Sequence, residues 1–157
     1  MDNLYNKLIN NIASGIKKSL FEYTSIIPDK KKRNNIKILY KPKNNRQLRN
    51  LVDLLVRKKV TNFNCIDVSL ITDFSNIFAG HDIGEIDLSG WDVSNGTTFG
   101  CMFKNCKRFN ADLSMWDVSN STDFYNMFYN CFKFNSDLSL WEVGNCTDFS
   151  GMFRNCF

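Results

Sequence analysis

The feature that most constrains this chain is a repeat of 25 residues in its C-terminal part. A fixed period of about 20–50 residues is typical of stacked repeat proteins, in which each unit buries a face that it could not bury alone. The repeated positions are a tryptophan, a leucine, a valine, two phenylalanines and a cysteine: Trp91/Trp116/Trp141, Leu88/Leu113/Leu138, Val93/Val118/Val143, Phe99/Phe124/Phe149, Phe103/Phe128/Phe153 and Cys106/Cys131/Cys156.

Each copy contains two apolar patterns. In residues 113–120, a leucine, a tryptophan and a valine stand at positions 1, 4 and 6, and an asparagine follows, which approximates the strand of a leucine-rich repeat. In residues 124–131, Phe, Met, Phe and Cys stand at i, i+3, i+4 and i+7, the spacing of a helical face. We therefore predict an α/β, leucine-rich-repeat-like solenoid of about four units over residues 62–157, with one short strand and one short helix per 25-residue unit.

Two segments precede the repeats. Residues 1–35 combine an amphipathic helix over residues 4–20 with a basic linker that contains Lys30-Lys31-Lys32-Arg33. Residues 36–61 form an N-terminal cap, with a short strand before Pro42 and a helix that begins at Asn44 or Asn45. The apolar side chains that this helix should bury are Leu48, Leu51, Val52, Leu54 and Leu55.

The phrase Asp-Leu-Ser-Met-Trp-Asp-Val-Ser-Asn of residues 112–120 recurs from Asp87 with one variable position, and with two further changes from Asp137. Together with residues 122–131 it resembles the BspA-like leucine-rich-repeat family of bacterial surface proteins, also known as a domain of unknown function common in mycoplasmas. The resemblance implies a non-catalytic binding scaffold, often adhesive and often displayed on the cell surface. It also implies a helical lead-in cap within residues 40–52.

Charge is divided unevenly along the chain. Residues 1–60 contain 15 Lys and Arg against 4 Asp and Glu, a net charge of +11, and residues 61–157 contain 5 against 12, a net charge of −7. Such asymmetry indicates two segments with different surroundings. The asymmetry leaves open an alternative function, the binding of nucleic acid or an anionic surface through the basic N-terminal segment. Because a run of only four basic residues is more often a solvated linker, nucleic acid is the less favoured partner.

The repeats predict an acidic, serine-lined face. Identical positions in stacked units form columns about 4.8 Å apart from unit to unit. One interpretation is a face that binds a protein partner, and the other is that Asp and Ser only satisfy backbone groups at each turn. A second acidic column, Asp87/Asp112/Asp137, is open to the same two interpretations. The candidate face consists of Asp92, Asp117 and Glu142, flanked by Ser89, Ser114 and Ser139.

The sequence predicts no catalytic, cofactor or metal site. His81 is the only histidine, which leaves no His-dependent triad, and there is no Gly-rich phosphate loop, calcium loop or paired Cys and His zinc pattern. The cysteines at 106, 131 and 156 continue an apolar face and are expected to be buried, reduced thiols. We therefore expect a protein–protein interaction or adhesion module and not an enzyme.

No run of residues has the length of a membrane span, and polar residues interrupt every candidate signal-peptide core in residues 1–25. The sequence thus predicts a chain that stays where it is made, in contrast to the surface location that the family resemblance implies. The last unit carries apolar core residues up to Phe157. Three interpretations of this uncapped end are self-association, docking of a partner, and a truncated repeat protein without autonomous function.

Overall fold

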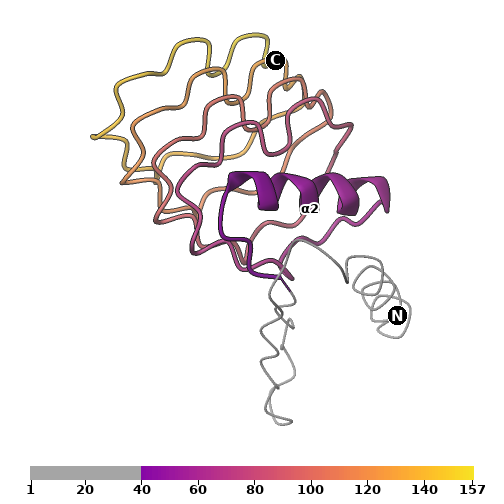
Figure 1. Ribbon diagram of the computed structural model, residues 1–157. Coiled ribbons are helices and arrows are strands. Elements are labelled where there is room, and N and C mark those ends of the chain that lie inside the picture. Colours follow the sequence, from indigo (N-terminus) through magenta and orange to yellow (C-terminus); the bar gives the residue numbers. More distant parts are fainter. Residues whose placement is uncertain (1–39) are drawn as a thin grey trace.

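A computed structural model describes residues 40–157 of the chain. The predicted helix over residues 4–20 and the basic linker lie outside the described residues. The described part begins with one helix, α2 (Asn45–Arg57), and continues as a series of coils that lie over one another (Figure 1). α2 packs at the start of this stack, and the C-terminal coil lies at the far end.

The helix predicted to begin at Asn44 or Asn45 is present. Asn44 is the N-cap, and its side-chain oxygen accepts a hydrogen bond from the Gln47 amide at 3.0 Å. The Gln47 side-chain oxygen in turn accepts a hydrogen bond from the Lys43 amide at 2.8 Å. The apolar face of α2 buries Leu48, Leu51, Val52 and Leu55, whereas Leu54 is only partly buried.

α2 is joined to the first coil by polar contacts as well as apolar packing. The Asn45 side-chain amide donates to the carbonyls of Asp73 and Ser75 at 3.1 and 2.8 Å. His81, which stands where the later copies have cysteine, places Nε2 2.8 Å from Asp53 Oδ1 on α2. The helix therefore covers the first coil in the position that another coil occupies in the rest of the stack.

The predicted α/β leucine-rich-repeat-like solenoid is wrong. Residues 40–157 contain one helix and no strand, so no unit has the predicted strand and helix. Successive coils are instead joined by isolated parallel bridges, such as Asp73 with Thr98, Thr98 with Asp123, and Asp123 with Asp148. Each 25-residue copy is a coil built almost entirely from turns.

The segment predicted as a strand folds back on itself. The Trp91 amide donates to the Leu88 carbonyl at 3.0 Å, which closes a four-residue turn. The same bond is made between Trp116 and Leu113 at 3.1 Å. A turn also brings residues at positions 1, 4 and 6 to the inside, so the apolar spacing did not distinguish it from a strand.

The segment predicted as a helix is interrupted by left-handed residues. Asn126 and Asn130 have φ values of 52° and 62°, a region that a right-handed helix excludes. The amides of Phe124 and Phe128 donate to Asp148 and Met152 of the next coil, at 2.8 and 2.9 Å, and not to a carbonyl four residues back. The signal for this was the Asn or Gly that occupies the position of Asn130 in every copy, because these residues tolerate positive φ best.

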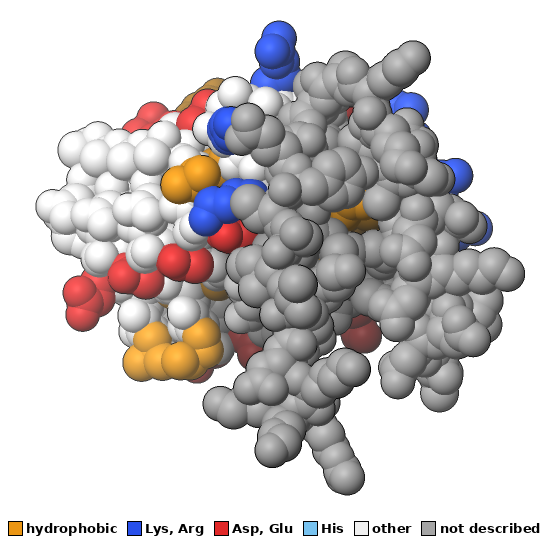
Figure 2. Space-filling view, turned by 60° about the horizontal axis from the view of Figure 1, so that its bottom comes forward, with side chains coloured by type: hydrophobic (Ala, Val, Ile, Leu, Met, Phe, Trp, Pro, Cys, Tyr) orange, Lys and Arg blue, Asp and Glu red, His pale blue; other side chains and the backbone are white. Residues whose placement is uncertain are grey.

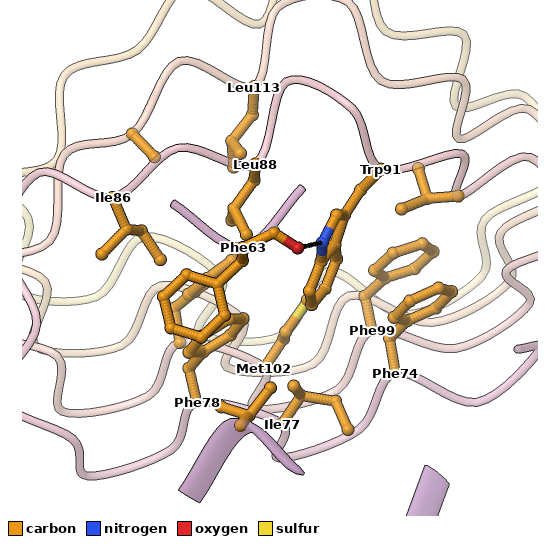
Figure 3. Close-up of a cluster of buried hydrophobic side chains, with 14 of the residues drawn as sticks. Phe63, Phe74, Ile77, Phe78, Ile86, Leu88, Trp91, Phe99, Met102 and Leu113 are labelled. Carbon is orange, nitrogen blue, oxygen red and sulfur yellow. Dashed lines mark hydrogen bonds between the residues drawn. The ribbon is translucent and has the colours of Figure 1, made fainter. Parts of the chain in front are cut away.

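The core lies between the tryptophan-bearing and phenylalanine-bearing segments of each coil (Figure 3). Trp91 and Trp116 stack with ring centroids 6.4 Å apart, and Phe78 and Phe103 stack at 5.3 Å. The Trp91 indole donates to the Phe63 carbonyl at 3.1 Å, so its one polar atom is satisfied inside the core. Side chains that alternate along the chain with these core residues consequently point outward. Those of the tryptophan-bearing segment and those of the phenylalanine-bearing segment lie on different sides of the coil.

Candidate functional site

The acidic residues of the candidate face are exposed and fall in successive coils. Asp92, Asp117 and Glu142 each stand between an inward-facing tryptophan and an inward-facing valine, which directs their side chains to solvent. Asp67 precedes them in the first coil but is already paired with Lys41, with Nζ and Oδ2 2.7 Å apart. The unpaired part of this column therefore begins at Asp92.

Local hydrogen bonds explain part of this column. Asp92 Oδ1 accepts the Ser94 amide at 3.1 Å and the Ser94 hydroxyl at 2.6 Å. Asp117 Oδ1 accepts the same two groups of Ser119 at 3.0 and 2.7 Å. The turn thus uses one carboxylate oxygen of each aspartate, and no hydrogen bond from a described residue occupies Oδ2.

The serines of the candidate face serve the second acidic column instead. The amides of Ser89, Ser114 and Ser139 donate to the carboxylates two residues earlier, at 3.0, 3.0 and 2.9 Å. These carboxylates belong to Asp87, Asp112 and Asp137. The serines predicted to flank the candidate face therefore bond to the second column, Asp87/Asp112/Asp137, and not to Asp92, Asp117 and Glu142.

The same hydrogen bonds lower the pKa of three of these carboxyl groups. The Ser119 hydroxyl and amide lower the pKa of Asp117 below its usual value. The backbone amides of Ser114 and Ser139, followed by their hydroxyls, lower the pKa of Asp112 and of Asp137. These bonds therefore favour the charged form of Asp112, Asp117 and Asp137.

Two exposed apolar side chains lie between the two acidic columns. Met115 is 83% exposed and Leu140 is 69% exposed, one in each of two neighbouring coils. Together with Asp117 and Glu142 they line a hollow of about 320 Å³, and Leu140 also lines a second hollow beside Asp112 and Asp137. Figure 2 shows a row of acidic side chains across one face, with exposed hydrophobic side chains beside it.

We call this region the acidic–apolar surface. Its apolar residues were missed in the sequence because Met115 and Leu140 stand at the variable position of the repeated phrase, where the preceding copy has Gly90. A signal was available, since a solvent-facing position that changes from glycine to methionine to leucine is not explained by the turn. Its acidic residues are Asp92, Asp117, Glu142, Asp112 and Asp137.

The repeated phrase lies within the residues that a family model matches. The model of a family described as "Mycoplasma protein of unknown function, DUF285" matches residues 47–157, which include part of α2 and all the coils. The chain belongs to the DUF285 family. No curated protein and no solved structure matches it.

The cysteines of this DUF285 chain are free thiols, and three of them form a ladder, in which Cys106 and Cys131 are buried and Cys156 is partly buried. Cys106, Cys131 and Cys156 donate through Sγ to carbonyls 28 residues earlier, at 3.0, 3.0 and 3.1 Å. Burial raises the pKa of Cys106 to about 12 and also raises that of Cys131. These thiols are therefore packing groups with little nucleophilic character.

Within residues 40–157 there is no group of three or more His, Cys, Asp or Glu side chains placed to hold a metal ion. The same part of the chain has no helix with the length and apolar character that crossing a bilayer requires.

Proposed function

We propose that this DUF285 protein is a non-catalytic protein-binding module that recognises its partner through the acidic–apolar surface. The observation that carries the proposal is the exposure of Met115 and Leu140 between two rows of carboxylates. Interfaces commonly combine an apolar centre with a polar rim, and an exposed apolar side chain of this size costs solubility if nothing covers it.

The charge pattern adds a second argument. Like charges repeated from coil to coil repel one another, which the turn interpretation alone does not offset. Glu142 supports this point, because its copy has Gly144 in place of the serine that bonds Asp92 and Asp117. A negative residue is thus present in a coil in which the Asp-Ser turn is absent. Adhesion, which the resemblance to BspA-like surface proteins implies, is the form of binding that we propose.

A site-specific crosslink tests this function. A photo-crosslinking amino acid in place of Met115 should join the chain to a defined protein in extracts of the organism that encodes it. The same amino acid in place of Thr97, which is exposed at another position of the coil, serves as the matched control. Absence of any product specific to position 115 would contradict the proposal, as would a product that survives Leu140→Ser together with Glu142→Lys.

A further inference from the structure

One copy of the repeat carries an Asn-Gly pair, Asn95–Gly96, and the sequence has no other such pair. The residue after the corresponding asparagine is serine at 121 and cysteine at 146. Because glycine has no Cβ, its backbone nitrogen can approach the side-chain carbon of a preceding asparagine with little steric hindrance. Of the asparagines at this repeat position, Asn95 is therefore the one most open to attack by its own backbone.

The packing of the core requires the glycine. Gly96 is buried, and a Cβ on it would lie 2.5 Å from Phe99 Cζ and 2.9 Å from the Val93 carbonyl oxygen. Phe99 is held in place by stacking on Phe74 and Phe124, with ring centroids 5.0 and 5.7 Å apart (Figure 3 shows the first of these pairs). The same core that fixes Phe99 thus retains a reactive pair of residues in this turn.

Hydrogen bonds hold this pair away from a reactive geometry. The Gly96 amide donates to the Val93 carbonyl at 2.7 Å. The Asn95 side-chain amide donates to the Ser69 carbonyl of the preceding coil at 2.9 Å, and the Ser121 hydroxyl of the following coil donates to the Gly96 carbonyl at 3.3 Å. Attack requires the Gly96 nitrogen to lose its bonded proton and the Asn95 side chain to leave the preceding coil, so both contacts between coils must open first.

We propose that Asn95–Gly96 is a self-modification site that reacts only when its coil opens from the neighbouring coils. The Gly96 nitrogen forms a bond with Asn95 Cγ, the bond from Cγ to Nδ2 breaks, and ammonia leaves with the proton of the Gly96 amide. Water then adds to either carbonyl carbon of the resulting cyclic imide, which gives aspartate or isoaspartate. Water is the only other reactant, and nothing is oxidised or reduced. The acidic–apolar surface and its partner have no part in this inference.

The product cannot restore the contact that opened. The Asn95 amide donates to the Ser69 carbonyl, whereas an ionised carboxylate only accepts hydrogen bonds. The new carboxylate would face a carbonyl oxygen, and the isoaspartate form also adds a methylene group to the backbone of the turn. The reaction therefore makes a transient opening between two coils permanent.

Peptide mapping by mass spectrometry tests the gating. The full chain is incubated at mildly alkaline pH, folded in buffer and unfolded in urea, and the conversion of each asparagine to the acid is followed with time. Asn95 should convert in urea and react roughly tenfold or more slowly in the folded chain, because only the open fraction reacts. Equal rates at Asn95 in the two conditions would overturn the inference.

Asn120 is a matched control within the same molecule. Its side chain makes the corresponding bond, to the Ser94 carbonyl at 2.8 Å, but it is followed by Ser121. Asn120 should therefore convert much more slowly than Asn95 in urea, and Ser121→Gly should remove this difference. Asn95 and Asn120 reacting at the same rate in the unfolded wild-type chain would overturn the assignment of the site to the Asn-Gly pair.

Two further variants test the gate and its consequence. Ser121→Ala removes the bond to the Gly96 carbonyl, so conversion of Asn95 in the folded chain should become severalfold faster. Asn95→Asp should unfold at a lower urea concentration than Asn95→Ala, because alanine only loses the bond to Ser69 and aspartate adds a charge against its carbonyl. An unchanged rate in a Ser121→Ala chain that is folded by circular dichroism would overturn the gating, and an Asn95→Asp chain as stable as wild type would overturn the permanent opening.

Discussion

The middle and the last coil of the stack have the same local structure but very different burial. The Met127 and Cys131 amides close turns onto Phe124 and Phe128 at 3.0 and 2.9 Å. In the last coil, the equivalent bonds of Met152 and Cys156 measure 3.0 and 3.1 Å. Phe124 and Phe128 are nevertheless 0% exposed, whereas Phe149 and Phe153 are 43% and 50% exposed.

This difference shows that a coil depends on two separate sets of interactions, the hydrogen bonds within it and the packing against its neighbours. The bonds that close turns within a coil are the same in the middle and the last coil. Burial of the phenylalanines needs a neighbour on both sides, and the first coil obtains one of its neighbours from α2. Stability should therefore depend on position in the stack even where residue and conformation are the same.

The largest effect expected from this comparison is on the phenylalanines. Phe128→Ala should lower the free energy of unfolding by about 3–5 kcal/mol, because it leaves a cavity between two coils. Phe153→Ala should cost roughly half of that or less, since half of its ring already faces solvent. Urea unfolding followed by tryptophan fluorescence measures both, and equal losses would refute the two-neighbour explanation.

The next effect concerns the left-handed asparagines. Asn130 donates to Asn105 and accepts from Asn155, at 2.7 and 2.8 Å, with a φ of 62°. Asn130→Ala should cost about 2–3 kcal/mol, because it loses both bonds and strains the backbone, and Asn130→Gly should cost about 1 kcal/mol less. Asn155→Ala loses only one bond and should cost less than Asn130→Ala. If the Gly and Ala variants unfold at the same urea concentration, positive φ is not the reason for asparagine at position 130.

A smaller effect is expected for the thiol ladder. Cys131→Ala should cost about 1 kcal/mol, through the lost bond to the Phe103 carbonyl and a small cavity, and Cys156→Ala less, because Cys156 is only partly buried. Since burial raises the pKa of Cys106 to about 12, iodoacetamide at neutral pH should modify Cys106 only after unfolding. Peptide mapping by mass spectrometry measures this labelling, and rapid labelling of Cys106 in the folded protein would contradict its burial in the thiol ladder.

The smallest effect is expected for the Asp-x-Ser turns, which are present in both the middle and the last coil. Hydrogen bonds from Ser119 lower the pKa of Asp117, and those from Ser150 lower the pKa of Asp148 in the last coil. A pKa lowered in the folded state contributes stability that is present above the unfolded value of 3.8 and is lost as the pH falls through the folded value. NMR titration should place both groups below 3.8, and Ser119→Ala should raise the Asp117 value towards it. A pKa of 3.8 or higher at either group would contradict the role of the serine that bonds to it.

The sequence alone predicted those features for which the local pattern of residues has only one structural interpretation. Asn44 as a helix cap followed by apolar residues at helical spacing is such a case, and so is the 25-residue period. It did not predict the structure inside a coil, because the spacing of Phe124, Met127, Phe128 and Cys131 suits consecutive turns as well as a helix. Hydrogen bonds between coils favour the turns over the helix, and these bonds join residues about 25 positions apart.

The candidate surface was partly predictable for the same reason. Residues that alternate with Trp116 and Val118 had to face solvent, and Asp117 does. The partner of each serine was not predictable without the turn geometry, which assigns Ser114 to Asp112. The exposed Met115 was passed over because its position is the one that the repeat does not hold constant.

The ladders that join one coil to the next have a consequence for how the molecule would respond to tension. Within residues 40–157, the Asn, Thr, Cys and Trp side chains that bond across coils connect only neighbours, as in Thr122 to the Thr97 carbonyl and Cys131 to the Phe103 carbonyl. A pull on the C-terminal end would therefore load the last coil first and leave the others intact. The chain should peel in steps of one coil, each releasing roughly 80 Å of extended polypeptide. A tether made in this way would yield gradually instead of breaking at once.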